Sequence, residues 1–172
     1  MERLLTATFD SPVGPLMLVA SDRGLRAVLW PTEKDGRVRL PETAPDESAP
    51  EAAARHVLRR AMAQLDEYFA GTRREFDVPL DPHGTDFQQQ AWNQLRLIPY
   101  GTTITYGEQA ARMGDRNKSR AVGAANGRNP ISIIVPCHRV VGSTGALTGF
   151  AGGVDTKGWL LQHERGERPL PL

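Results

Sequence analysis

A ten-residue stretch near the middle of the chain, FDVPLDPHGT (residues 76–85), constrains the fold more than any other feature. Its two prolines and its glycine interrupt any helix or strand that would run through it. Short apolar runs open the sequence before it, whereas the sequence after it has mostly helical periodicity. The stretch therefore predicts an α+β protein of two units, an N-terminal domain over residues 1–78 and a C-terminal domain over residues 79–172.

The N-terminal part has the pattern of a small antiparallel sheet followed by a helix. Three apolar runs, LLTATFD, PLMLVA and LRAVLW, are separated by the turn-like SPVG and SDRG. Prolines at positions 31, 41, 45 and 50 predict a long surface loop over residues 31–50. A helix is expected next, ending before Gly71, which suits a C-terminal cap. The apolar residues that share one face of this helix are Val57, Leu58, Ala61, Leu65 and Phe69.

The second unit is predicted to consist mainly of short helices. Thr85 with Gln88, and Thr105 with Glu108, are capping boxes that open two of them. The segment GDRN breaks the chain before KSRAVGAANG, which gives a helix-turn-helix pattern. ISIIV is expected to be a buried strand, GSTGALTGFAGG a loop, KGWLLQHERG a last helix and ERPLPL a poorly ordered tail.

Charge is distributed unevenly, although the formal net charge is only +1. Residues 1–83 contain 11 basic and 14 acidic side chains, and residues 84–172 contain 10 and 6. A basic half can attract a polyanion, although a mixed solvated surface explains so small an excess almost as well. No apolar run is long enough to cross a bilayer, and the N-terminus lacks the pattern of a signal peptide.

The only cysteine, Cys137, lies in IIVPCHRVVG. One cysteine excludes an internal disulfide and any site with several thiolates, and no two histidines have metal-ligand spacing, so no metal is expected. A lone cysteine is most often buried packing. Here it follows the expected strand and precedes His138 and Arg139, either of which favours a thiolate. Because neighbours in an extended chain point to opposite sides, His138 would reach the thiol only through a turn or a water molecule.

The second helix of the helix-turn-helix pattern combines basic and small side chains. Lys118, Arg120 and, past the helix end, Arg128 alternate with alanine, glycine and serine. Small side chains let a backbone approach nucleic acid closely, and a free helix N-terminus favours phosphate. The same small face is equally expected where one helix packs on another.

Together these residues resemble the O6-alkylguanine-DNA alkyltransferases from about Gly84 to Glu164. The resemblance is carried by PCHRV after NP, by SRAVGAANG upstream, and by GFAGG and KGWLLQHE downstream. It implies a ribonuclease-H-like N-terminal domain with a mainly structural role and a winged helix-turn-helix C-terminal domain. It also implies that an alkylated guanine is flipped out of duplex DNA and that a cysteine takes the alkyl group from O6 and is spent. No cofactor is needed, and whether O4-alkylthymine is also repaired stays open.

The resemblance assigns roles to individual residues. Cys137 matches the reactive cysteine, His138 the histidine that deprotonates it through a water, and Glu164 the carboxylate that orients this histidine. Arg120 matches the arginine that enters the minor groove in place of the flipped base. Tyr106 matches the tyrosine that presses on the target phosphate and can protonate the leaving guanine.

The remaining expected site residues follow from the same resemblance. Asn129 matches an asparagine whose contacts hold the site together. Other residues expected to contact DNA are Lys118, Ser119, Gly123 and Arg128, and those expected to line the pocket are Val140, Thr148, Gly149, Phe150 and Ala151. The chain departs from relatives at Phe150, where some have a tyrosine, and at Arg128, where a glycine is common and an arginine would add a phosphate contact.

Two rival functions use the same residues. A non-catalytic binder of alkylation damage would bind DNA without becoming alkylated, and a cysteine hydrolase with a Cys137–His138 pair would turn over without DNA. Neither accounts for the basic helix and the thiol together. We expect a monomer in a bacterial cytoplasm, able to cluster on DNA, whose partner is duplex DNA containing O6-alkylguanine and not a membrane.

Overall fold

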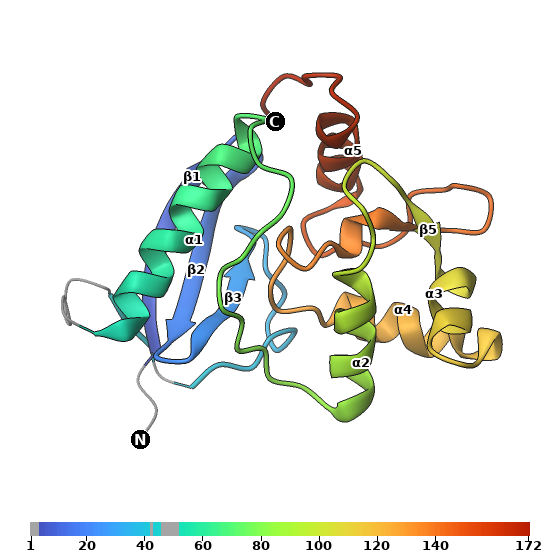
Figure 1. Ribbon diagram of the computed structural model, residues 1–172, viewed down its shortest axis with the longest axis horizontal. Helices are drawn as coiled ribbons and strands as arrows, with labels where there is room; N and C mark the ends of the chain where they lie inside the picture. The colour runs from blue at the N-terminus through green and yellow to red at the C-terminus, as the bar shows by residue number, and fades with distance from the viewer. Residues whose placement is uncertain (1–3, 42, 46–51) are drawn as a thin grey trace.

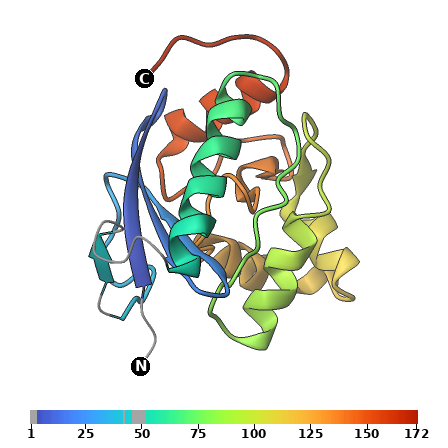
Figure 2. The ribbon, with the colours of Figure 1, turned by 60° about the vertical axis from the view of Figure 1, so that its left-hand side comes forward.

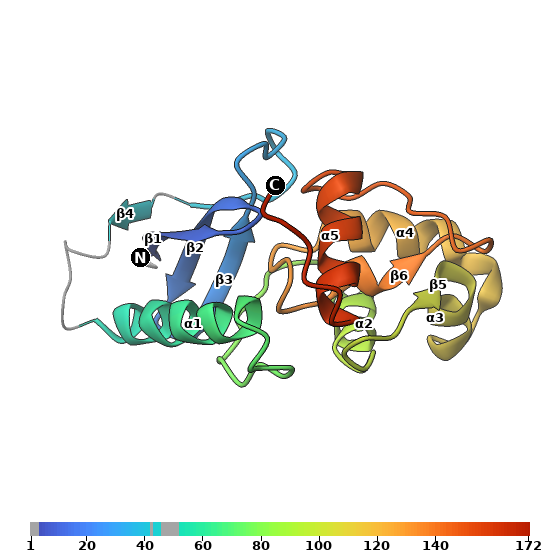
Figure 3. The ribbon, with the colours of Figure 1, turned by 90° about the horizontal axis from the view of Figure 1, so that it is seen from above.

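Two units lie side by side in the computed structural model, which describes residues 4–41, 43–45 and 52–172 (Figure 1). The first is a sheet covered by one long helix, and the second is a group of short helices, as Figure 3 shows from above. The α+β class predicted from the sequence is confirmed. Within the described residues, no helix is both long and apolar enough to span a bilayer.

The N-terminal sheet is an antiparallel meander of β1 (Leu4–Ser11), β2 (Gly14–Ser21) and β3 (Gly24–Leu29), as predicted. A short strand, β4 (Thr43–Pro45), pairs in parallel with β1 inside the segment expected to be a loop. Three residues, the last of them a proline, carry no periodic pattern, so the sequence did not indicate this strand. Residues 42 and 46–50 of the predicted loop lie outside the described residues.

The long helix α1 (Ala53–Phe69) packs across β1 and β2 on one face of the sheet (Figure 2). Its predicted apolar face is buried at Val57, Leu58, Ala61 and Leu65, while Phe69 is half-buried. Gly71 has φ +82° and donates its N–H to the Tyr68 carbonyl at 3.0 Å, so the expected cap is present. The buried ring of Tyr68 contacts Tyr100 and His163, and it therefore joins α1 to the second unit.

The second unit contains four helices, two short 3₁₀ helices and a two-strand parallel pair. Thr85 and Gln88 form both bonds of a capping box at the start of the first helix. At Thr105 only half of the box forms, because the Glu108 carboxylate contacts the Thr105 hydroxyl and not its backbone N–H. The elements are α2 (Asp86–Leu95), β5 (Ile104–Thr105), α3 (Tyr106–Arg112), η2 (Arg116–Lys118), α4 (Ser119–Gly127), η3 (Cys137–Arg139), β6 (Val140–Val141) and α5 (Val154–Glu164).

A buried pair of amides fixes the helix-turn-helix. The side chains of Gln109 in α3 and Asn126 in α4 exchange two hydrogen bonds, at 3.1 and 2.8 Å. Gln109 also donates to the Ala91 carbonyl in α2, and Trp92 of α2 donates to the Ala125 carbonyl in α4. Because unpaired buried amides are costly, these bonds hold the three helices in one relative orientation.

The segment ISIIV is not a strand. Ile131 makes a single bridge to Val28 of β3, and the chain then turns through Ile133, which has φ +72°. The segment is buried as expected, but an unbroken apolar run looks the same in a strand and in a buried turn. Cys137 consequently opens the 3₁₀ helix η3 and does not end a strand.

Two other segments also differ from expectation. The tail is not free, because Leu172 donates its N–H to the Pro12 carbonyl and Trp159 donates to the Leu170 carbonyl. Helix α5 begins three residues earlier than predicted, directly after Gly153, which has φ +93°. The connecting segment runs along β3, where Leu25 bonds the Pro79 carbonyl at 2.8 Å, and the domain boundary between residues 78 and 79 stays a prediction.

Candidate active site

Cys137 lies at the first position of η3, between the two units. Its N–H donates to the Val135 carbonyl at 2.9 Å, and its side chain borders a cavity while the residue as a whole is only 9% exposed. Successive side chains of a 3₁₀ helix are about 120° apart and not on opposite sides. The chain therefore turns at Cys137, which is one of the two conditions under which His138 can serve the thiol.

His138 and Arg139 both bind the carboxylate of Glu164, which comes from the last turn of α5. The His138 Nε2 atom lies 2.6 Å from Glu164 Oε2, and Arg139 donates to both carboxylate oxygens at 2.8 and 3.1 Å. The Tyr68 hydroxyl from α1 donates to Oε2 at 2.7 Å. All four residues are buried, so the network is a closed group of charge-assisted hydrogen bonds.

These contacts set the protonation states. Burial alone would raise the pKa of Glu164, but the charges and hydrogen bonds of His138 and Arg139 hold it well below its usual range. Burial lowers the pKa of His138 even though Glu164 opposes this shift. A neutral His138 beside an ionised carboxylate carries its proton on Nε2. Its Nδ1 atom is then a bare acceptor, and this buried atom has no hydrogen-bond partner among the described residues.

A lysine that sequence reasoning missed contributes to the thiol's environment. Burial raises the pKa of the Cys137 thiol, while a hydrogen bond from Asn129 and the positive charge of Lys157 act to lower it. Lys157 is 1% exposed, bonds the Thr148 carbonyl at 3.3 Å and lies 5.8 Å from the centre of the Tyr106 ring. Lys157 and Glu164 are two turns apart on one face of α5, and this spacing is the signal that would have identified the lysine.

Asn129 holds the turn that precedes the cysteine. Its amide donates to the Val135 carbonyl at 2.8 Å, and its side-chain oxygen accepts the Ile131 N–H at 3.0 Å. Arg37 from the N-terminal unit donates to the Asn129 carbonyl at 2.8 Å. The Trp30 ring nitrogen donates to Ser132 in the same turn. Neither of these two contacts from the first unit was expected.

The cavity beside Cys137 is about 20 Å³ in volume, which is room for one water molecule. Phe150 forms part of its wall and stacks edge-on against Trp30, with ring centres 5.5 Å apart. The Thr148 hydroxyl donates to the Tyr106 hydroxyl at 3.0 Å across the edge of the site. Of the expected pocket residues, Gly149, Phe150 and Ala151 line this cavity, Thr148 is exposed beside it, and the structure does not bring Val140 to it.

The expected DNA-contacting residues lie on and around α4. Arg120 and Lys118 are exposed, and Lys118 lies over the Phe87 ring at 5.9 Å. Ser119 begins α4, and Gly123 packs against the Tyr106 ring, where an added Cβ would lie 3.7 Å from two ring carbons. Arg128 is exposed and reaches across to the N-terminal unit, where it donates to the Gly36 carbonyl at 3.1 Å. Among the described residues, no three His, Cys, Asp or Glu side chains form a group that could hold a metal ion.

Comparison with known proteins agrees with this arrangement. The family profile of the 6-O-methylguanine DNA methyltransferase ribonuclease-like domain matches residues 4–82, and that of the DNA-binding domain matches residues 86–166. A methylated-DNA–protein-cysteine methyltransferase of Methanosarcina acetivorans is 47% identical over 92% of this chain and 96% of its own length. The relative from Shigella flexneri with the same name is 43% identical over 95% of this chain and 97% of its own. A crystal structure of Mycobacterium tuberculosis OGT in complex with DNA superposes with a TM-score of 0.82 at 44% identity, covering 97% of this chain and 95% of that one. The chain belongs to the 6-O-methylguanine DNA methyltransferase family, with both of that family's domains.

Proposed function

We propose that the protein repairs O6-alkylguanine in duplex DNA by moving the alkyl group to Cys137, once per molecule. The observation that carries this proposal is the buried His138–Glu164 pair next to the thiol, with a free acceptor atom on the histidine. A hydrolase would also need a group that activates water for a second step. A damage binder without chemistry would have no use for a buried base beside a thiol.

The first step removes the thiol proton. The proton passes from Cys137 to the free Nδ1 atom of His138 through a bridging water molecule, as expected from the sequence. The imidazolium that forms is stabilised by Glu164, whose position is fixed by Arg139 and Tyr68. The thiolate, helped by the nearby charge of Lys157, is then the nucleophile.

The second step transfers the alkyl group. The sulfur forms a bond to the alkyl carbon as the bond from this carbon to O6 breaks, and the electron pair stays on the guanine. The guanine then needs one proton, and the Tyr106 hydroxyl supplies it; this role is supported by the position of that hydroxyl at the edge of the site, where it accepts from Thr148. The product is a stable thioether, so Cys137 is consumed.

The base reaches the thiol only if the wall of the pocket moves. A purine is far larger than the present cavity, and the segment between β6 and α5 that carries Phe150 is mostly exposed. We expect this segment to shift when the base enters. Arg120 fills the gap in the duplex and offsets part of the cost of extruding the base, which is a few kcal/mol.

Intact-mass analysis after incubation with duplex DNA containing O6-methylguanine tests the proposal. One methyl group per protein is expected, located at Cys137 by peptide mapping. Cys137→Ser should form no adduct and still bind the duplex. An unchanged mass would favour a damage binder, and release of product over many turnovers would favour a hydrolase. We also place the protein in the cytoplasm, supported by its bacterial relatives.

A further inference from the structure

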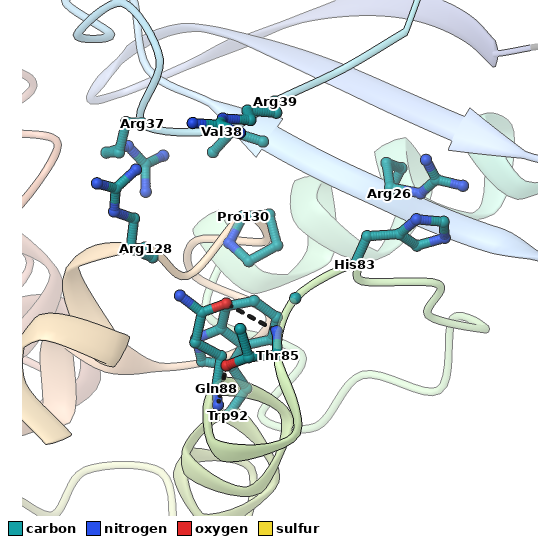
Figure 4. Close-up of a pocket in the computed structure, with 11 residues that line it drawn as sticks. Arg26, Arg37, Val38, Arg39, His83, Thr85, Gln88, Trp92, Arg128 and Pro130 are labelled. Carbon is teal, nitrogen blue, oxygen red and sulfur yellow. Dashed lines mark hydrogen bonds between the residues drawn. The ribbon is translucent and has the colours of Figure 1, made fainter. Parts of the chain in front are cut away.

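A second, much larger cavity lies between the two units and is lined by four arginines (Figure 4). It measures about 570 Å³, which is within the range of small-molecule sites, whereas the cavity beside Cys137 holds about one water molecule. Arg37 and Arg39 come from the segment after β3, Arg26 comes from β3 itself, and Arg128 follows α4. The other lining residues are Val38, His83, Gly84, Thr85, Gln88, Trp92 and Pro130.

The acidic groups that the structure describes nearby neutralise only half of this charge. Asp81 pairs with Arg26 at 2.9 Å and lies 3.4 Å from His83, and Glu33 pairs with Arg37. Among the residues that the structure describes, no acidic side chain lines the cavity itself. Arg128 donates only to the neutral Gly36 carbonyl, and Arg39 is exposed without a side-chain partner among the described residues. About two positive charges are therefore left without a counter-charge from the described part of the chain.

The geometry of these arginines suits an anion. In Figure 4 the guanidinium groups of Arg37 and Arg128 lie close to one another from the two units, and Glu33 neutralises only Arg37, so an anion beside Arg128 would be favoured. Guanidinium groups offer several donors in a plane and bind phosphate in two-point fashion. On the opposite side of the cavity, the capped start of α2 contributes Thr85, Gln88 and the positive end of the helix dipole.

We propose that this cavity is a second phosphate site, which holds phosphodiester groups of the DNA backbone beyond the nucleotide in the active site. The identity of the occupant follows from the position of this cavity directly beside the active site and α4. Arg37 lines both this cavity and the one beside Cys137, and Arg128 directly follows the helix that carries Arg120. A DNA strand that leaves the active site along the C-terminal end of α4 would pass the opening of the cavity. The N-terminal unit would then contact DNA through Arg39, in addition to its structural role. The site does not depend on the alkyl-transfer step.

The salt dependence of DNA binding tests this site directly. Each phosphate contact to duplex DNA contributes about 0.9 to the slope of log affinity against log salt concentration. Arg39→Gln and Arg128→Gln should each reduce the magnitude of this slope by about 1, because each removes one phosphate contact. The measurement is fluorescence anisotropy with an undamaged duplex long enough to extend past α4 on both sides. Arg59→Gln is the matched control, because Arg59 is an exposed arginine on α1, away from the cavity.

Two further measurements identify the source of the phosphate. With a duplex too short to extend beyond the helix-turn-helix, the slope of log affinity against log salt concentration should be the same for wild type and Arg39→Gln. Arg39→Gln should also react normally with a free benzylated guanine base, so a failure of the phosphate site is distinguishable from a failure of alkyl transfer. If Arg39→Gln and Arg59→Gln give equal slopes on the long duplex, the cavity does not bind DNA. Thermal stabilisation by pyrophosphate that is lost in Arg39→Gln would then assign it to a soluble anion and overturn the proposal.

Discussion

The two sides of Cys137 are built in opposite ways. On the inner side, the buried side chains of Tyr68, His138 and Arg139 saturate the Glu164 carboxylate, and within this described network His138 Nδ1 is the polar atom left without a partner. On the outer side, Arg120 and Lys118 are exposed, and the wall of the pocket is a loop. The difference teaches that the proposed catalytic network is arranged before DNA arrives, whereas the groups proposed to contact DNA are still exposed to solvent. Changes on the inner side should therefore affect every substrate, and changes on the outer side only duplex DNA.

Loss of the carboxylate charge should have the largest effect. Glu164→Gln keeps the shape of the side chain but cannot stabilise a protonated His138, and it leaves Arg139 without its counter-charge. We expect the single-turnover rate to fall by about 10²–10⁴-fold, the usual contribution of general-base catalysis. Rapid-quench assays with a methylated duplex and with a free benzylated base should give the same loss. Unchanged rates with either substrate would show that the His138–Glu164 pair does not take part in removing the thiol proton.

Arg120→Ala should impair the reaction with duplex DNA but not the reaction with the free base. Its exposed side chain has no contact with the buried network, so reaction with the free base should stay within twofold of wild type. With a methylated duplex, loss of part of the stabilisation of the flipped state should slow repair by about 10–100-fold, because base extrusion costs a few kcal/mol. Arg96→Ala, which removes another exposed arginine of the second unit, is the control. Equal losses with duplex and free base would contradict the assignment of Arg120 to DNA.

This division also explains what the sequence could and could not predict. The meander, α1 and the helix-turn-helix follow from periodicity and caps, because each is a local pattern. The basic and small residues Lys118, Ser119 and Arg120 are recognisable in the same way, since they are neighbours in the chain, and their contact with DNA stays a prediction. The contacts of Tyr68 and Arg37 with the second unit join residues more than 90 positions apart, and no local pattern encodes them. The apolar run before Cys137 misled for a different reason, because its turn depends on hydrogen bonds of the Asn129 side chain and on packing against β3, and hydrophobicity alone indicates neither.

Lys157→Met should change the pH dependence of the reaction. Burial raises the pKa of the Cys137 thiol, and the Lys157 charge opposes that shift. Without the charge the thiol pKa rises further, so the rising limb of the rate against pH should move to higher pH. If the thiol pKa rises by about one unit, the rate at neutral pH falls about tenfold. The profile should be measured with the free benzylated base, and the melting temperature should not fall, because a buried cation is replaced by an apolar side chain. A uniformly lower rate with an unmoved limb would show that Lys157 acts only through packing.

The smallest effect is expected for Tyr68→Phe, which tests whether the inner side extends into the N-terminal unit. The substitution removes only the hydroxyl that donates to Glu164 Oε2. A hydrogen bond to a charged group is worth about 1.5–3 kcal/mol, and part of this should appear as a lower free energy of unfolding. The carboxylate also becomes freer to move, so we expect a rate loss of about 3–10-fold, equal for duplex and free base. Tyr100→Phe is a close control, because the Tyr100 ring packs on Tyr68 and near Arg139 but its hydroxyl has no hydrogen bond to Glu164 among the described residues. If Tyr68→Phe is destabilised but reacts as fast as Tyr100→Phe, the N-terminal unit supports the fold without positioning the carboxylate.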